Sequence, residues 1–405
     1  MEKGVPEKVP PPGTLTGATS GRLESVDALR GFVMALMALD HARDFFHWGA
    51  LHGVDPLAPA TTTPALFFTR WITHLCAPVF VLLAGAGVYL SAAHGKTKGD
   101  LSRFLLKRGA WLILLEMTFV QWAGWAWRVE PKVHFALVLW AIGWSMIGLA
   151  ALIHLPLRWV AAIGVVLCVG HNAFDGVNAA ELGAFGPLWQ VLHEGGEVAL
   201  GNGHRLLAGY PLVPWVGVMA VGYAIGAWLL LEPVKRRRRL VFAGTGFIAA
   251  FIVLRASAVY GDPNPWKPGA RTLESVYLFL SCAKYPPSLC YLLMTLGPAL
   301  LLLAWWDLRG PAWTAPLLTF GRVPMFFYLL HLPLLHSLSL AVALATWGQA
   351  SWLFGFPAGS APQHVGTGLT GVYLAWLGAL SLLLLVCRQF ERLKTAHPSR
   401  WLAYI

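Results

Sequence analysis

Apolar runs of about twenty residues recur along almost the whole chain, separated by short polar segments rich in Pro and Gly. A run of this length is what an α-helix needs to cross the hydrocarbon core of a bilayer. The pattern predicts about ten transmembrane helices, with nine to eleven allowed. They are expected near residues 25–47, 72–93, 104–126, 134–154, 157–173, 211–231, 239–258, 286–306, 315–344 and 366–387.

The run at 315–344 differs from the others because it contains Pro316, Pro324 and Pro333. Proline lacks the backbone N–H that an internal helical turn requires, so this run is expected to be kinked or broken.

Composition agrees with the hydropathy pattern. Hydrophobic residues make up 57% of the 405 residues and charged residues 12%, which is far from a soluble average. The fold class is therefore predicted as all-α, a polytopic helical membrane protein.

The net charge of +11 indicates membrane topology rather than nucleic-acid binding. Basic residues precede the first predicted span and follow the second, sixth and tenth, so ten spans place all four clusters on one side. By the positive-inside rule both termini are expected to be cytoplasmic. The clusters are Lys3, Lys8 and Arg22; Lys96, Lys98, Arg103, Lys107 and Arg108; Lys235 and Arg236 to Arg239; and Arg388, Arg392, Lys394 and Arg400.

Three parts are expected along the chain. Residues 1–23 are polar and rich in Pro and Gly, without the features of a cleavable signal, and predict a disordered cytoplasmic tail. Residues 24–390 form the transmembrane domain and 391–405 a second cytoplasmic tail. The five cysteines show no metal or disulfide spacing, which favours packing roles.

The longest connection, 172–210, is expected on the outer side, and loops of this length are more often functional or lid-like than idle. It contains HEGGE at 193–197, which resembles part of a zinc-protease helix. The second histidine is absent and Gly195 with Gly196 disfavours the helix that would align ligands. No metal site is therefore predicted.

The first span carries ionisable residues on one face. Spacings of 4, 3, 4 and 3 put Arg30, Met34, Met37, His41 and Asp44 on one stripe of a helix. Arg30 and His41 differ by about 20° around the axis and lie roughly 16 Å apart along it. Charges inside a bilayer are costly unless they face protein or water, so this stripe is expected to line a polar cavity.

His41 is the candidate catalytic residue of this stripe. Imidazole takes and returns protons near neutral pH and can carry an acyl group transiently. Asp44 one turn later, or the adjacent Asp40, can hold one ring nitrogen and leave the other as a base. Arg43 can pair with Asp40 or hold a substrate anion.

Asp27 and Arg30 lie one turn apart near the cytoplasmic end, where pairing lowers the cost of burying each charge. A competing interpretation is that all these charges merely join helices together. The number of ionisable residues in one span favours a site instead.

The segment RLESVDALRGFVMALMALDH at 22–41 is similar to the first catalytic span of the heparan-alpha-glucosaminide N-acetyltransferase family. The spacing from Arg30 to His41 also resembles the signature of the broader membrane acyltransferases that O-acylate surface glycans. Further stretches resemble the bacterial branch of the family: TRWITHLCAPVFVLLAG at 69–85, YPLVPWVGVMAVGYAIG at 210–226, KYPPSLCYLLMTLGP at 284–298 and GRVPMFFYLLHLPLLH at 321–336.

The resemblance implies transfer of an acetyl group from acetyl-CoA, across the membrane, to an acceptor on the far face. In the lysosomal relative the acceptor is the amine of a terminal glucosamine, and a histidine just outside the equivalent span is implicated. When the two sequences are aligned from Arg22 without gaps, that histidine corresponds to His52, and His41 corresponds to an asparagine of the relative. We favour His41, which also fits the Arg30 spacing, with His52 and His47 as reserves.

Acetyl-CoA is the expected co-substrate, with no metal. Its phosphates would be drawn to Arg30 or to the basic loop around Arg103, Lys107 and Arg108. His41 then either accepts the acetyl group or deprotonates the acceptor, and both routes stay open.

Arg43, His74 and Lys284 are candidate donors to the developing oxyanion. His74 is expected at the outer start of the second span, where a role in the site and a role in packing are equally favoured.

Arg322, His331 and Trp215 are also assigned to the substrate-binding set. Arg322, Tyr328 and His331 form an arrangement that also occurs in the family, and His331 is expected to line the cavity. Trp215 would be a sugar-stacking wall, although an interfacial aromatic belt is the favoured interpretation for it.

The expected partners are acyl-CoA, an amino-sugar or glycan acceptor and the lipid bilayer, without nucleic acid and with a homodimer left open. Localisation is expected in a membrane, the bacterial inner membrane by family type. The alternatives are an O-acyltransferase of a surface glycan or lipid-linked sugar, and a proton or solute transporter without covalent chemistry.

Overall fold

The computed structural model describes residues 23–93, 95–127, 132–309, 314–354, 361–397, 399 and 402. The predicted amino-terminal tail, apart from residue 23, lies outside this part of the chain, as do residues 398, 400, 401 and 403–405 of the predicted carboxy-terminal tail.

Helices occupy all ten ranges that the hydropathy pattern predicts. They are α1 (Glu24–Phe46), α3 (Pro64–Ile72) continued through η1 (Thr73–Leu75) into α4 (Cys76–Ala93), α5 (Lys98–Leu115) continued by the π-helix η2 (Glu116–Ala126), α6 (Val138–Leu152), α7 (Leu157–Gly170), α9 (Leu212–Leu229), α10 (Pro233–Ser257), α12 (Leu289–Arg309), α13 (Ala315–Arg322) followed by α14 (Pro324–Trp347), and α15 (Leu369–Ala396).

Seven helices of the described residues are long and apolar enough to cross a membrane. The charged α1, α5 with η2, and the shorter α6 are outside this group. The count of about ten spans and the cytoplasmic placement of both termini therefore stay predictions.

The predicted break in the 315–344 run is present. α13 ends at Arg322 and α14 begins at Pro324, where the missing N–H of proline costs no hydrogen bond. Pro333 is accommodated inside α14.

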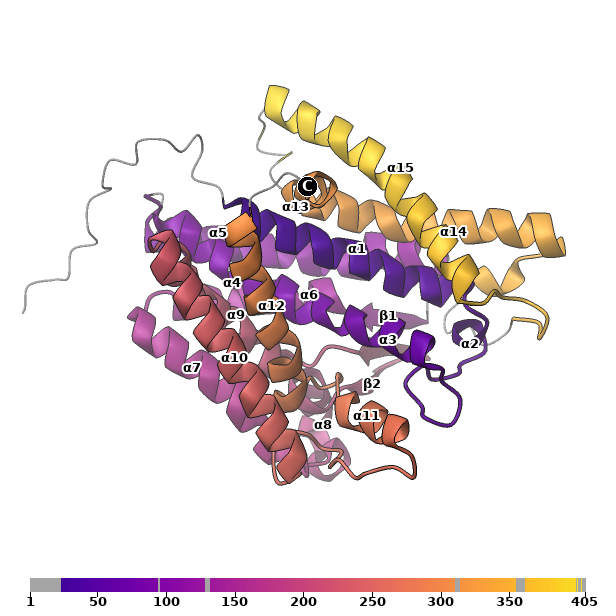
Figure 1. Ribbon diagram of the computed structural model, residues 1–405, viewed down its shortest axis with the longest axis horizontal. Helices are drawn as coiled ribbons and strands as arrows, with labels where there is room; N and C mark the ends of the chain where they lie inside the picture. The colour runs from indigo at the N-terminus through magenta and orange to yellow at the C-terminus, as the bar shows by residue number, and fades with distance from the viewer. Residues whose placement is uncertain are drawn as a thin grey trace, which may run out of the picture.

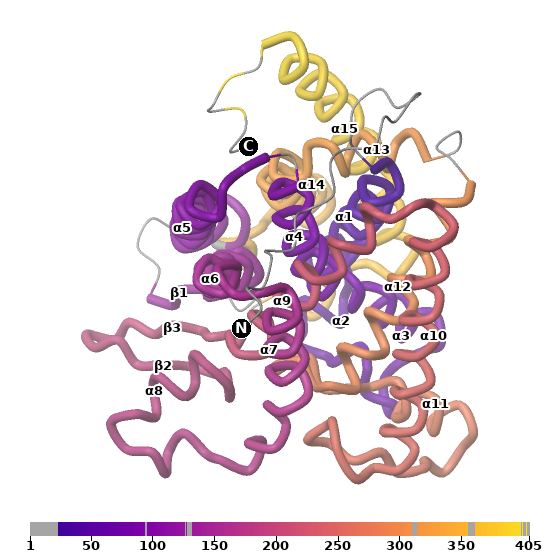
Figure 2. The backbone as a smooth tube through the Cα atoms, turned by 90° about the vertical axis from the view of Figure 1, so that its left-hand side faces the viewer, coloured from indigo at the N-terminus to yellow at the C-terminus, as the bar shows by residue number. Residues whose placement is uncertain are grey.

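The all-α class is wrong in one respect, because the chain also forms a small sheet. β1 (Val133–Ala136) pairs in parallel with β3 (His204–Ala208), and β2 (Gly196–Gly201) pairs antiparallel with β3. Asn202 and Gly203 join β2 to β3 with φ of 51° and 78°, the left-handed turn conformation that these residue types tolerate. Figure 2 shows this sheet between α6 and α8 (Gly186–Trp189). The connection 172–210 is thus folded rather than irregular.

α1 runs through the middle of the bundle (Figure 1). It packs against α4, α12, α13, α14 and α15, while α4 and α7 pack on α9, α5 on α6, and α10 on α12. Glycines permit the closest of these approaches. A Cβ on Gly31 would lie 1.8 Å from the carbonyl oxygen of Leu317, and one on Gly321 would lie 1.9 Å from that of Asp27. α1 and α13 therefore touch backbone to backbone, as helices in membranes commonly do.

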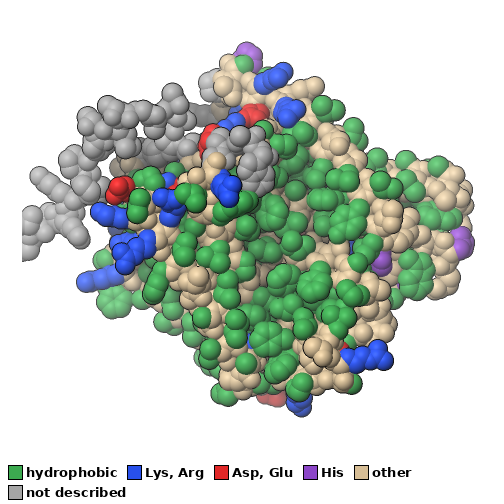
Figure 3. All heavy atoms as spheres, viewed as in Figure 1, with side chains coloured by type: hydrophobic (Ala, Val, Ile, Leu, Met, Phe, Trp, Pro, Cys, Tyr) green, Lys and Arg blue, Asp and Glu red, His purple; other side chains and the backbone are tan. Residues whose placement is uncertain are grey.

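The outer surface is largely apolar on the face shown in Figure 3, with Lys and Arg gathered at its upper left edge. Long hydrophobic side chains such as Phe242 and Val253 on α10 and Leu374 and Leu385 on α15 are exposed. Such a surface is suited to lipid rather than water, and the chain is an integral membrane protein.

Gly321→Ala is expected to lower the melting temperature of the detergent-solubilised protein, because the added methyl group meets backbone that cannot move aside. Overpacking of this kind costs about 1–3 kcal/mol. Gly378→Ala on α15 is the matched control, since its Cβ would meet no atom within 4 Å. Equal melting temperatures for the two variants would contradict the close contact between α1 and α13.

Candidate active site

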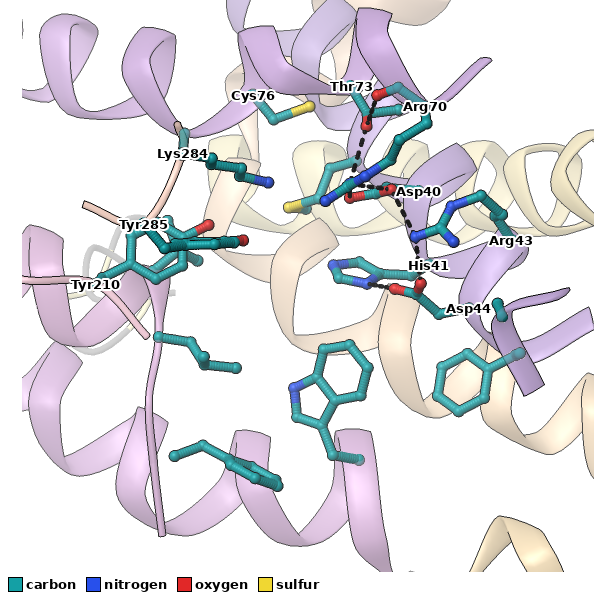
Figure 4. Close-up of a pocket in the computed structure, with 18 of the residues that line it drawn as sticks. Asp40, His41, Arg43, Asp44, Arg70, Thr73, Cys76, Tyr210, Lys284 and Tyr285 are labelled. Atoms are coloured by element: carbon teal, nitrogen blue, oxygen red, sulfur yellow. Dashed lines mark hydrogen bonds and ion pairs between the residues drawn. The ribbon is translucent and has the colours of Figure 1, made fainter. Parts of the chain in front are cut away.

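A cavity of about 570 Å³ lies beside the carboxy-terminal half of α1 (Figure 4). This volume is within the range of small-molecule sites, about 300–1,000 Å³. The charged side chains in its lining are Asp40, Arg43, Asp44, Arg70 and Lys284, and His41 lies among them. Cations outnumber carboxylates, so the lining favours a ligand that carries or develops negative charge.

Asp40 is joined to a second helix by an ion pair. Nη1 of Arg70 on α3 donates to both carboxylate oxygens of Asp40 at 2.5 Å, and the two side chains are each 14% exposed. The same nitrogen donates to Thr73 Oγ1 at 3.3 Å. This contact fixes α3 against α1 at the cavity wall.

Arg43 holds the second carboxylate. Its Nη2 donates to Asp44 Oδ1 at 2.6 Å and lies 3.4 Å from Asp40 Oδ1. Its Nε is buried and makes no hydrogen bond within the described residues. Arg43 is thus held between the two carboxylates of α1.

His41 is oriented as a general base requires. Its Nδ1 lies 3.3 Å from Asp44 Oδ2, and its ring packs edge-on against Trp125 with a centroid distance of 5.0 Å. In Figure 4 the second ring nitrogen points away from Asp44, toward the side of the cavity that holds Lys284 and Tyr285. With the Nδ1 proton donated to Asp44, Nε2 carries the lone pair.

Two tyrosines and a lysine from connections between helices form the opposite wall. Tyr285 follows Lys284 just before α12, and Tyr210 lies just before α9 with its ring centroid 5.3 Å from that of Tyr285. Desolvation by itself would raise the pKa of the Tyr285 phenol, but the positive charges of Lys284 and Arg70 bring that pKa below its ordinary value. Burial, reinforced by Tyr285, raises the pKa of Tyr210. Tyr285 is therefore the more acidic phenol of the pair.

Several predicted site residues lie behind the lining. His331 is fully buried on α14 with its ring centroid 5.2 Å from that of His41, and its Nδ1 donates to the Tyr328 carbonyl. His74 is also buried, and its carbonyl accepts the hydroxyl of Tyr291 at 2.8 Å. Both belong to the packing that supports the site rather than to its surface.

Other predicted residues lie elsewhere. His52 stacks on Trp48 and bonds to the Trp48 and Pro362 carbonyls, apart from the cavity lining. Trp215 is fully buried in α9, so it is neither a lipid-facing belt residue nor a wall of this cavity.

The polar residues at the amino-terminal end of α1 are also distant from the lining. Arg30 pairs with Asp27 at 2.9 Å and donates to the Gly321 carbonyl. Arg322 pairs with Glu391 and Glu24. The stripe on α1 is therefore split, and only its carboxy-terminal half reaches the cavity.

The lining also contains residues that the site prediction did not include: Arg70, Tyr210, Tyr285, Trp125 and Tyr328. Arg70, Tyr210, Tyr285 and Tyr328 stand in stretches that resemble the family, which was the available signal. Trp125 belongs to a π-helix that the hydropathy pattern did not distinguish from an ordinary helix.

Residues 22–258 match the family model described as heparan-alpha-glucosaminide N-acetyltransferase, catalytic, which covers more than half of the chain. No curated protein matches the chain. The matched region contains Asp40, His41, Asp44, Arg70 and Tyr210, whereas the lining residues from the loop before α12 and from α14 lie beyond it.

Asp40→Asn is expected to destabilise the protein by about 3–5 kcal/mol, because it leaves Arg70 buried without its partner charge. Removing both partners with Asp40→Asn and Arg70→Gln should recover part of this loss. Denaturant unfolding in detergent micelles measures both effects.

Glu197→Gln is the matched control. Its partner Arg205 lies at 2.6 Å, yet the two side chains are 49% and 53% exposed, so the cost should not exceed about 1 kcal/mol. An equally mild effect of Asp40→Asn would show that the buried pair does not hold α3 to α1.

Proposed function

The chain belongs to the heparan-alpha-glucosaminide N-acetyltransferase catalytic family, and from that membership we propose that it transfers an acetyl group from acetyl-CoA to the amine of an amino sugar. The observation that carries this proposal is the cavity in which His41, held by Asp44, faces a basic and phenolic wall. The acceptor would reach the cavity from the outer face and the donor from the cytoplasm. We place the protein in the bacterial inner membrane with both termini cytoplasmic.

His41 is the proposed base. Its Nε2 takes the proton that the acceptor nitrogen loses as that nitrogen attacks the thioester carbonyl. The carbon–sulfur bond then breaks, and His41 returns the proton to the departing CoA sulfur. Asp44 keeps the ring in the required tautomer and stabilises the imidazolium between the two proton transfers.

The thioester oxygen becomes negative during this attack and needs donors. Lys284, Tyr285 and Arg43 are the proposed donors, since they line the same cavity as His41. Such preorganised donors act strongly where water is excluded. Arg70, which forms an ion pair with Asp40, adds positive charge to the cavity wall.

The CoA phosphates need a separate basic surface. Arg30 is committed to Asp27 and Gly321, so we assign the phosphates to the basic residues Arg103, Lys107 and Arg108, which the structure places in α5 rather than in a loop. Arg103 is 73% exposed at the amino-terminal part of α5 and available to a soluble ligand.

His41→Gln is expected to reduce acetyl transfer about 10²–10⁴-fold, the usual contribution of a positioned base. The assay follows label from acetyl-CoA to a pool of amino sugars, using the purified full-length protein in detergent. His52→Gln is the matched control and should retain near-native activity. Loss of activity in His52→Gln with retention in His41→Gln would reverse the assignment.

The same assay distinguishes direct transfer from an acetyl-histidine intermediate, and N-acetylation from O-acylation and from transport. Label that stays on the native protein without acceptor, but is absent from His41→Gln, indicates an acetyl-histidine; absence of such label indicates direct transfer. Ester-linked rather than amide-linked product would favour the O-acyltransferase. No consumption of acetyl-CoA would contradict the enzyme and lead to proton-flux and solute-flux assays.

Tyr285→Phe is expected to remove the alkaline limb of the pH–rate profile or to shift that limb to higher pH. A donor phenol acts while protonated, so activity should fall as pH rises through its pKa, which Lys284 and Arg70 hold below the ordinary value. Initial rates between neutral and alkaline pH measure this limb, and an unchanged limb in Tyr285→Phe would exclude Tyr285 as the titrating donor.

A further inference from the structure

Two imidazoles and a carboxylate converge at the end of α7, away from the catalytic cavity. They come from His171 at the start of η3 (His171–Phe174), Asp175 in the turn that follows, and His193 in η5 (Gln190–Glu194). One ligand atom from each lies within 4.8 Å of the other two. Nothing in the proposed acetyl transfer uses these residues.

Three polar atoms of this cluster, both ring nitrogens of His171 and Oδ1 of Asp175, are buried without a hydrogen bond among the described residues, and Oδ1 lies 3.9 Å from His193 Nε2. His171 is 3% exposed, and neither of its ring nitrogens makes a hydrogen bond of acceptable geometry, although the Pro287 backbone lies near enough to influence the ring. Asp175 Oδ1 is also buried without a hydrogen bond. Burying such groups without a hydrogen bond is costly, so a ligand between them would be stabilising.

The surrounding contacts hold the three side chains in place. Asn172 Nδ2 donates to Asp175 Oδ2 at 2.8 Å, which leaves Oδ1 facing the cluster. His193 stacks on Trp189, and its Nε2 donates to the His171 carbonyl at 2.7 Å. Hydrogen bonds from ligand side chains to a carbonyl or an amide are typical of the outer shell of metal sites.

We propose that His171, Asp175 and His193 bind a divalent transition metal of the zinc type. Imidazole nitrogen and carboxylate oxygen are ligands that Zn²⁺ accepts in tetrahedral sites. Asp175 is 18% exposed, which leaves a direction from which a water can complete the coordination. His193 would bind through Nδ1, retaining its bond to the His171 carbonyl, or through Nε2, replacing that bond.

The bound metal would fasten the connection 172–210 to the end of α7. This connection carries β2 and β3 and ends at Tyr210, which lines the catalytic cavity. Because the unfolded chain does not present the three ligands together, binding would stabilise the folded state. The site therefore has a structural role, separate from acetyl transfer.

The test uses the full-length protein in detergent, purified without a polyhistidine tag and stripped with a chelator. After equilibration with Zn²⁺ and gel filtration, elemental analysis should find about one zinc per chain, and the melting temperature should rise above that of the stripped protein. Co²⁺ in place of Zn²⁺ should give the visible absorption of a tetrahedral nitrogen and oxygen site.

His193→Gln and Asp175→Asn should each lose the bound zinc and the rise in melting temperature, while their stripped forms melt close to the stripped native protein. His154→Gln, at an exposed histidine, should bind as the native chain does. His204→Gln is a second control, because His134 and His204 form another imidazole pair at 3.2 Å on the sheet.

Three results would overturn the proposal. They are zinc at trace level in the native protein, zinc retained equally by His193→Gln and Asp175→Asn, and zinc lost in His204→Gln but kept in those variants. Each is read from bound metal and melting temperature, so failure of the proposed acetyl transfer would leave the outcome unaffected.

Discussion

The need to compensate charges on a largely buried helix governs the arrangement around α1. A carboxylate or guanidinium cannot leave water for a low-dielectric interior unless an opposite charge and hydrogen bonds meet it. Asp40 therefore requires Arg70, and Arg43 requires Asp44. Since Arg70 belongs to α3, this requirement sets the position of a second helix and leaves a polar cavity between the two.

The other end of α1 is fixed by shape as well as charge. Gly31 and Gly321 allow α1 and α13 to meet at their backbones, and Arg30 reaches the Gly321 carbonyl. The break before Pro324 then redirects the chain into α14, which brings His331 behind His41. The packing of α1 thus combines a close backbone contact at its amino-terminal end with a polar cavity at its carboxy-terminal end.

Connections between helices supply much of the remaining chemistry. Tyr210 and the Lys284–Tyr285 pair come from segments between helices, and the imidazole cluster lies where 172–210 leaves α7. These segments are folded and make specific contacts, so their side chains have defined positions outside the apolar spans. Connections placed by a rigid bundle are a common source of functional residues.

The sequence by itself determined the helical membrane class, the ranges of the helices, the break near Pro324 and the clustering of ionisable residues on α1, because hydropathy, proline chemistry and helical spacing are local properties. It did not determine the three-stranded sheet, the Arg70–Asp40 pair, or which of His41, His52 and His74 lies at the cavity. His171 and His193 are 22 positions apart, and HEGGE alone gave no reason to join them. Such contacts are decided when distant segments pack, since burial and charge pairing depend on neighbours that no local pattern specifies.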